Sequence, residues 1–388
     1  MLSGMLITNS KDLQDFCAHL QNQSAIAVDT EFVREHTYHP VVCLIQVASE
    51  EKAACIDPLA EGIDLSPLFK VMQNKKVMKV FHAARQDIEI FYMLTGKVPT
   101  PVFDTQIGAL ACGFDDNSPY HSLVSAYTGV RLDKSSRVTA WDLRPLTAEQ
   151  ESYALSDVTY LIEVYKQMRE QLESSGRLAW IQDKMRALED PDLYNPQPYE
   201  MWKKIKCYSS NPKFLAALRE LCAWREQLAQ TLNRPRKSVL KDEGVLEIAS
   251  LRPNTAEGLS ALRASSKSLL KHADEVLEAL RRAESYPADF FPPPKKEKVL
   301  PAWAKSTAEA LRLLLSVVCA QEGVATCLIA SADDLEKIAL SDTADVPAMQ
   351  GWRYDLFGQK ALAFKRGELL LSFDEKAHRM MFEPRCLK

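Results

Sequence analysis

The first half of the chain alternates short apolar runs with segments of helical periodicity. The apolar runs predict strands at residues 25–32, 41–49, 53–58 and 76–82. The helical segments lie at residues 10–21, 65–74, 84–95, 104–112 and 147–174. Three strands in succession, followed by strands that alternate with helices, are typical of an α/β domain with a mixed sheet. We therefore predict a domain of this class over residues 1–186.

The pattern changes beyond this domain. A stretch rich in Pro, Asp and Asn, EDPDLYNPQPYEMW, predicts a linker over residues 187–210. Residues 211–286 then show helical periodicity in every segment and no strand pattern. A proline-rich stretch at 287–302 cannot be helical and predicts a second linker, after which residues 303–375 are again helical and 376–388 form a tail. We expect two small all-helical modules after the α/β domain.

Composition narrows the class of protein. The 388 residues are 46% hydrophobic and 26% charged, with a net charge of -4, as in a globular protein of two or three domains. No apolar run approaches the ~20 residues that a membrane span needs, and the first residues do not resemble a secretory signal. The 9 cysteines are scattered and never spaced as CxxC, which favours reduced thiols. We expect a cytoplasmic monomer without a membrane partner.

Charge is distributed unevenly along the chain. Residues 201–300 contain 19 Lys and Arg against 12 Asp and Glu, so the first helical module is basic while the rest of the chain is acidic. Such a segment fits either a polyanionic partner or an ordinary solvated helix face.

Five residues carry the candidate chemistry. Asp29 and Glu31 lie two apart near the end of the first predicted strand, so their side chains project to the same face. Asp87 lies in the first turn of the helix that follows the strand at 76–82, and Tyr153 and Asp157 share one helix face at spacing i, i+4. Each residue has an ordinary explanation when taken alone: a solvated strand end, a helix-dipole partner or a solvated helix face.

Taken together, these side chains predict a metal centre. Oxygen ligands without His or Cys suit hard divalent cations such as Mg²⁺ or Mn²⁺. Four carboxylates could hold two such ions, which would stabilise the attacking and leaving oxygens of a phosphoryl displacement. A tyrosine, with an ordinary pKa near ~10, would orient the attacking water rather than deprotonate it.

Three motifs match a known family in order and spacing. The segments VDTEF, FHAARQDIE and YALSDV resemble the three exonuclease motifs of the DEDDy subfamily of DEDD 3′–5′ exonucleases, which have a ribonuclease-H-like fold. The surrounding segments are similar to those of the bacterial ribonuclease D family. The resemblance implies metal ligation by four acids and water orientation by Tyr153; the acids are Asp29, Glu31, Asp87 and Asp157.

The resemblance extends to the helical modules. Residues 211–286 look like an HRDC domain, the helical module that ribonuclease D shares with RecQ-type helicases. Residues 303–375 look like a second, more divergent copy.

Further residues are candidates for substrate contact. Near the predicted site these are Phe32, His82, Gln86, Lys134 and Arg137, although Phe32 and His82 also suit structural roles. In the basic module, Arg234, Arg236 and Lys237 cluster around a proline turn and are candidates for phosphate contact. Arg225 is a further candidate for this RNA-binding patch, and we expect its neighbour Trp224 to lie in the core.

The leading hypothesis is a metal-dependent 3′–5′ exoribonuclease. By resemblance it would release 5′-mononucleotides while it trims the 3′ ends of tRNA precursors and other small structured RNAs. Two alternatives stay open. The same five residues would serve a DNA exonuclease, because only contacts with the 2′-hydroxyl distinguish RNA from DNA. Alternatively, the protein is a non-catalytic scaffold whose helical modules bind nucleic acid and whose acidic site is inactive.

Overall fold

The computed structural model describes residues 4–132, 140–207, 209, 211–287, 290, 300–376 and 378–385. The chain divides into two compact units. One comprises Met1–Thr30, Leu44–Asp190 and Val299–Lys388, and the other comprises Glu31–Cys43 and Pro191–Lys298. The boundary falls inside a continuous strand, β2 (Ala25–Val33), so this strand belongs to both.

The α/β domain contains a six-stranded mixed sheet, as predicted. Its strand order is β1-β4-β3-β2-β5-β6. The pairs β1–β4, β2–β5 and β5–β6 are parallel, whereas β3 and β4 are antiparallel. The bounds are β1 (Gly4–Ile7), β3 (Val41–Ala48), β4 (Ala53–Ile56), β5 (Met78–Phe81) and β6 (Val102–Asp104). The four predicted strands are all present, and β1 and β6, of four and three residues, are additional.

The five predicted helices of this domain are also confirmed. They are α1 (Ser10–Leu20), α2 (Ser66–Met72), α3 (Arg85–Thr95), α4 (Thr105–Ala109) and α6 (Ala148–Ser174). The structure adds α5 (Tyr120–Thr128) and α7 (Leu178–Leu188). Helix α6 packs on the sheet through Val158, Leu161 and Tyr165, in one core with Val80 of β5 and Phe103 of β6. The core thereby holds the face of α6 in a defined position against the sheet.

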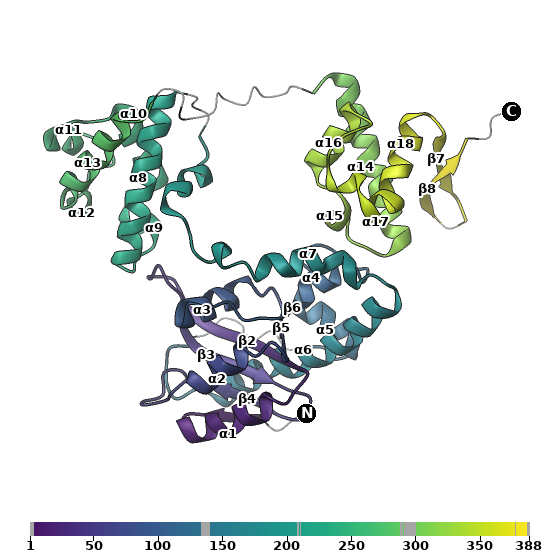
Figure 1. Cartoon of the computed structure of the whole chain (residues 1–388), viewed down its shortest axis with the longest axis horizontal. Helices are drawn as coiled ribbons and strands as arrows, with labels where there is room; N and C mark the ends of the chain where they lie inside the picture. Colours follow the sequence, from purple (N-terminus) through teal and green to yellow (C-terminus); the bar gives the residue numbers. More distant parts are fainter. Residues whose placement is uncertain are drawn as a thin grey trace. The chain divides into compact units, whose positions relative to one another are not determined.

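The second unit contains the basic helical module (Figure 1). Its helices are α8 (Pro212–Thr231), α9 (Arg236–Val239), α10 (Asp242–Leu251), α11 (Ala256–Ser260), α12 (Lys267–Leu270) and α13 (Ala273–Glu284). Leu218 and Leu221 of α8, Ile248 of α10 and Val276 of α13 are fully buried and form its core. Short 3₁₀ helices at Pro191–Leu193 and Pro198–Lys204 precede it, where a linker was predicted.

The last module begins with α14 (Ala302–Glu322), α15 (Thr326–Ile329) and α16 (Ala332–Leu340). A 3₁₀ turn at Pro347–Met349, α17 (Gly351–Arg353), a π-helical turn at Tyr354–Gly358 and α18 (Gln359–Lys365) complete its helices. Within the first unit it contacts the α/β domain, because Trp352 stacks on Trp180 of α7 with ring centroids 4.2 Å apart. The chain then forms a hairpin of β7 (Leu369–Asp374) and β8 (Arg379–Pro384), so the module is not entirely helical. Part of the segment predicted to be a tail is thus a strand.

Candidate active site

Strand β2 and helix α6 bring three carboxylates together. Asp29 and Glu31 project from the same side of β2, after the four buried residues at its start. Asp157 lies on α6, and one carboxylate oxygen from each of the three residues lies within 4.8 Å of the other two. All three side chains are half-buried, so the cluster is accessible to solvent. The predicted convergence of these three residues is therefore present.

The start of α6 is fixed by a capping box. The Thr147 hydroxyl accepts a hydrogen bond from the backbone N–H of Gln150 (3.2 Å), and the Gln150 side chain accepts one from the backbone N–H of Thr147 (2.8 Å). Tyr153 follows within two turns and lies one turn before Asp157, on the same helix face. The cap therefore sets where both side chains lie along the helix.

The corner between β5 and α3 presents Asp87. Ala83 has φ of 57°, which lets the chain turn sharply out of β5. The carboxylate of Asp104, at the end of β6, accepts backbone N–H groups of Ala83 (3.0 Å) and Ala84 (2.9 Å). It also caps α4 by accepting the N–H of Gln106 (2.8 Å). Asp104 thus anchors the corner from which Asp87 projects.

Asp87 itself is buried and lies outside the group of three carboxylates that could share one ion. Its carboxylate accepts a hydrogen bond from the Thr30 hydroxyl at 2.5 Å, from the strand that carries Asp29 and Glu31. Burial raises the pKa of Asp87 to about 7, against the opposing effect of the Thr30 hydrogen bond. A nearby cation would favour the charged form of this carboxyl.

Two further polar residues, His82 and Tyr120, connect the corner after β5 to the helix segment that carries Asp157. His82 bonds to the Thr105 hydroxyl through Nδ1 (3.0 Å) and to the backbone of Ser118, and burial lowers its pKa to about 4. Its ring lies 5.5 Å from that of Tyr120. The Tyr120 hydroxyl donates to the Ser156 carbonyl on α6 at 3.0 Å, next to Asp157. Burial raises the pKa of Tyr120, and the charges of Asp157 and Asp29 raise it further. Tyr120 is therefore a neutral support for the helix segment that carries Asp157.

The donor set fits a hard divalent cation. Three carboxylate oxygens at this separation can coordinate one ion, and the described cluster contains no His or Cys ligand. Without a cation, three carboxylates this close would repel one another. The arrangement can therefore concentrate positive charge where a phosphodiester would bind.

The comparisons with known proteins agree with this geometry. A family model described as 3′–5′ exonuclease matches residues 5–173, and a model of the HRDC domain matches residues 214–280. The ribonuclease D of Gluconacetobacter diazotrophicus is 41% identical over 372 residues, which cover 95% of each chain. That of Nitrobacter hamburgensis is 43% identical and covers 95% of this chain and 97% of its own. The chain belongs to the ribonuclease D family.

A solved structure supports the same assignment. The crystal structure of Escherichia coli RNase D, described as an exoribonuclease involved in structured RNA processing, is 29% identical and has a TM-score of 0.77. The match covers 94% of this chain and 99% of that one. As a member of the ribonuclease D family, the chain is a 3′–5′ exoribonuclease whose exonuclease domain depends on divalent metal ions. That the last module is a second HRDC domain stays a prediction.

Three of the other predicted contacts of this ribonuclease D family member lie among the described residues. Phe32 is half-buried on β2 directly after Glu31, and Gln86 is exposed in the first turn of α3. His82 has the two partners described above within the domain, which accounts for its position without RNA. Lys134 and Arg137 lie outside the described residues.

Two arginines of the predicted RNA-binding patch form ion pairs within the second unit. Arg225 is only 5% exposed and donates to the Leu240 carbonyl (2.9 Å) and to Asp242 (2.7 Å). It is therefore not a surface residue and cannot reach an RNA phosphate. The prediction that Arg225 belongs to the RNA-binding patch is wrong. The Arg236 guanidinium pairs with the fully buried Glu226 and lies over the ring of Tyr38. Its charge is already compensated by Glu226.

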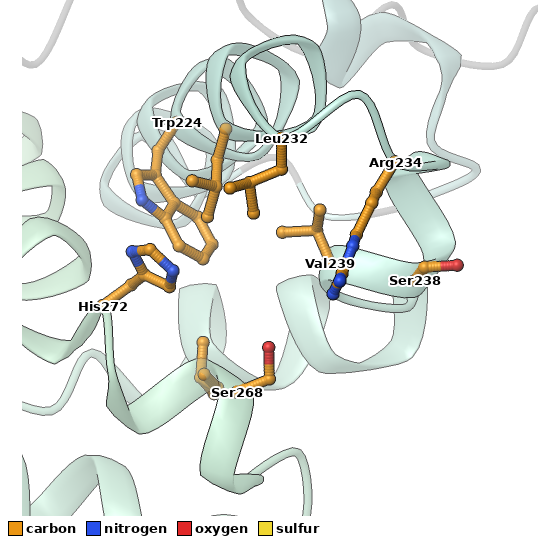
Figure 2. A pocket seen from close by; sticks show the side chains of 9 residues that line it. Trp224, Leu232, Arg234, Ser238, Val239, Ser268 and His272 are labelled. Atoms are coloured by element: carbon orange, nitrogen blue, oxygen red, sulfur yellow. The ribbon is translucent and has the colours of Figure 1, made fainter. Parts of the chain in front are cut away.

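Arg234 and Lys237, in contrast, are exposed on the surface of the HRDC domain. Figure 2 shows Arg234 and His272 approaching a small pocket from opposite sides, with Trp224 and Val239 among its apolar lining. Lys237 lines an adjoining groove of about 660 Å³ with Lys241 and Arg263. Trp224 is buried in the domain core, as predicted. The two basic residues of the predicted patch that are exposed, Arg234 and Lys237, therefore line these two hollows.

The sequence reasoning missed three residues that shape the site: Thr30, Asp104 and Tyr120. Thr30 lies between Asp29 and Glu31 and donates to Asp87. The alternation of side chains along β2 could have indicated that Thr30 projects to the other face of the strand. Asp104 ends an apolar run and starts a helix, which is typical of an N-cap. No local pattern marks Tyr120, because its partner Ser156 is 36 residues away.

Proposed function

We propose that this ribonuclease trims the 3′ ends of tRNA precursors and other small structured RNAs, one 5′-mononucleotide at a time. The observation that carries the proposal is the convergence of Asp29, Glu31 and Asp157, with Tyr153 one turn away on α6. Carboxylates without a nucleophilic Ser or Cys among them suit hydrolysis by an activated water.

The carboxylates would hold two divalent ions, Mg²⁺ or Mn²⁺. Asp29, Glu31 and Asp157 would hold one ion. Asp87, which is hydrogen-bonded to Thr30 of the same strand, would be a ligand of the second. When bound, such ions lower the pKa of a coordinated water and neutralise charge on the phosphate. The protein's own contribution would be to hold the carboxylates in place, through the Thr30 hydrogen bond to Asp87 and the capped start of α6.

Tyr153 would orient the attacking water. A phenol hydroxyl can donate a hydrogen bond to a water or accept one from it, and a neutral phenol is too weak a base to deprotonate water. Its position one turn before Asp157 places it on the helix face that carries the carboxylate. The tyrosine therefore selects the direction of attack and does not remove the proton.

The remaining residues near the site would hold the terminal nucleotides. Phe32 offers an aromatic surface against which a base can stack, and Gln86 offers an exposed amide for sugar or phosphate. His82 is neutral above pH 5, because burial lowers its pKa to about 4, so it can contribute a hydrogen bond but no charge. Lys134 and Arg137 are proposed phosphate contacts.

The HRDC domain would bind the structured part of the RNA. Arg234 and Lys237 offer cations beside the pocket and the groove of its basic surface, and phosphate contacts of this kind carry no sequence preference. We place the protein in the cytoplasm and expect it to act as a monomer. Among the described residues, none of the helices has the length and hydropathy for crossing a bilayer.

A product assay tests the proposal. The purified protein is given a 3′-extended tRNA and a single-stranded DNA of matched sequence, with Mg²⁺ or Mn²⁺. We expect the tRNA extension to shorten stepwise, with nucleoside 5′-monophosphates as the product and slower loss of the DNA. Faster cleavage of the DNA would make the protein a DNA exonuclease, and cleavage of neither would make it a binding scaffold.

A further inference from the structure

The loop between residues 140 and 146 is tied to the sheet by one ion pair. Arg144 donates to Asp57 with two nitrogens, Nε to Oδ2 at 2.6 Å and Nη2 to Oδ1 at 2.7 Å. Asp57 directly follows β4, and its side chain is 6% exposed. A bidentate pair of this kind fixes both the distance and the plane of the guanidinium, which a lysine could not do.

The same arginine also closes the loop on itself. Its Nη1 donates to the carbonyls of Trp141 and Leu143, at 2.8 Å each. At the start of the loop, the Gln150 amide lies 3.5 Å from the Ala140 carbonyl, while its oxygen completes the cap of α6. The loop is therefore held to β4 at one end and to the start of α6 at the other.

The loop presents Trp141 to the candidate water-orienting tyrosine. Trp141 is only 4% exposed, and its ring centroid lies 6.2 Å from that of Tyr153 with the planes inclined by 37°. Tyr153 is half-buried, so its ring has solvent on one side and needs a packing partner to keep one orientation. Trp141 is such a partner, and its own position depends on the loop.

We propose that Asp57 and Arg144 are positioning residues for the hydrolytic step. By holding residues 140–146, the pair keeps Trp141 against the ring of Tyr153 and so fixes where the tyrosine hydroxyl meets the attacking water. Small displacements of an orienting group are costly, because rate depends steeply on the geometry of attack. The inference rests on the proposed role of Tyr153, and neither residue needs to touch RNA or metal.

The test compares conservative variants in two backgrounds. Arg144→Lys keeps the charge but loses the bidentate geometry, and Asp57→Asn keeps the shape but loses the charge. With a short single-stranded RNA, we expect each to lower kcat about tenfold while KM changes less than about twofold. In a Tyr153→Phe background, which lacks the hydroxyl to be positioned, neither variant should lower kcat further.

Arg169→Met is the matched control. Arg169 lies half-buried on the same helix, about four turns beyond Tyr153, where it forms an ion pair with Glu173 and donates to the Tyr165 hydroxyl. Its loss should leave kcat unchanged in both backgrounds. Thermal melting of every variant separates loss of folded protein from loss of turnover. Trp141→Phe alters the ring contact with Tyr153 directly and should also lower kcat.

Two results would overturn different statements. If Arg144→Lys and Asp57→Asn lowered kcat by the same factor with and without the Tyr153 hydroxyl, the pair would not act through the tyrosine and the inference would be wrong. If Tyr153→Phe alone kept the full wild-type kcat, the proposed role of Tyr153 would be wrong, whatever the loop does.

Discussion

Asp29 and Glu31 are proposed metal ligands whose charges should also lower the stability of the fold. Together with Asp157 they form a cluster in which one oxygen of each carboxylate lies within 4.8 Å of the other two. Like charges at this distance repel one another and so destabilise the metal-free protein. A side chain selected for stability alone would be neutral at one of these positions.

The first prediction follows from this repulsion. Glu31→Gln keeps the shape of the side chain but removes one negative charge and one proposed metal ligand. We expect RNA trimming to fall at least about 100-fold, while the melting temperature without metal stays the same or rises. Single-turnover trimming and thermal melting in EDTA measure the two effects. Glu35→Gln, at an exposed position on the same segment, is the control, and a large fall in melting temperature for Glu31→Gln would contradict the account.

His82 gives a prediction about pH. Its pKa in the folded protein is about 4, below the ordinary value of about 6.5, because it is buried. Between these values the unfolded chain binds the proton and the folded chain does not, so stability is lost as pH falls from 6.5 toward 4. The contribution is at most roughly 3 kcal/mol. His82→Asn should flatten the fall of the unfolding free energy in this window, as urea titrations at a series of pH values would show; an unchanged slope would contradict a neutral His82.

At the scale of elements, the corner between β5 and α3 depends on a single carboxylate. Asp104 accepts three backbone N–H groups, those of Ala83, Ala84 and Gln106. Of these three donor residues, Ala84 is buried, Gln106 is half-buried and Ala83 is exposed. An aspartate is needed here because its two oxygens can bridge the corner and the start of α4.

Asp104→Ala should therefore cost both stability and activity. Leaving three backbone donors without this acceptor, the buried one of Ala84 among them, is expected to lower the unfolding free energy by about 2–3 kcal/mol. Displacement of Asp87 should slow trimming. Urea denaturation and trimming assays measure the two. Asn9→Ala removes the N-cap of α1 instead and should cost about 1 kcal/mol without affecting trimming. Equal trimming by the two variants would show that the corner does not position Asp87.

Periodicity predicted most, but not all, elements of the α/β domain. The apolar run from Ala25 to Val28 and the helical pattern of residues 147–174 were visible locally, and β2 and α6 formed where expected. Strand β6 has three residues, which is too short for a periodic signal, whereas β1 was missed although it is as long as β4 and β5. The metal ligands could be proposed because their spacing is local or matches a family, whereas the partners of Tyr120 and Arg144 are distant in the chain.

At the scale of the whole molecule, basic composition was a poor guide to which cations are free. Arg225 and Arg236 contributed to the basic count of the HRDC domain, yet they neutralise Asp242 and Glu226. Sequence periodicity could not show this, because the arginine of each pair comes from a different element than its acid. The surface with Arg234 and Lys237 emerged only after the internal ion pairs were assigned.

The double variant Arg234→Met, Lys237→Met tests this surface. We expect weaker binding of 3′-extended tRNA, and a slope of log K against log salt that is smaller by about 1.5, since each lost phosphate contact contributes about 0.7–0.9. Turnover of a short single-stranded RNA should be unchanged. Filter binding at several salt concentrations provides the measurement, with Arg312→Met on the exposed side of α14 as control. An unchanged slope would locate the RNA on another surface.

The central claim is that acidic side chains from β2, α3 and α6 form one metal centre that hydrolyses the RNA 3′ end. The most direct test is trimming of 3′-extended tRNA by the wild type and by Asp157→Asn, each with Mn²⁺, with Mg²⁺ and with EDTA. We predict trimming only by the wild type and only with metal, together with a metal-dependent rise in melting temperature that Asp157→Asn lacks. Trimming by Asp157→Asn at the wild-type rate, or by the wild type in EDTA, would contradict the account.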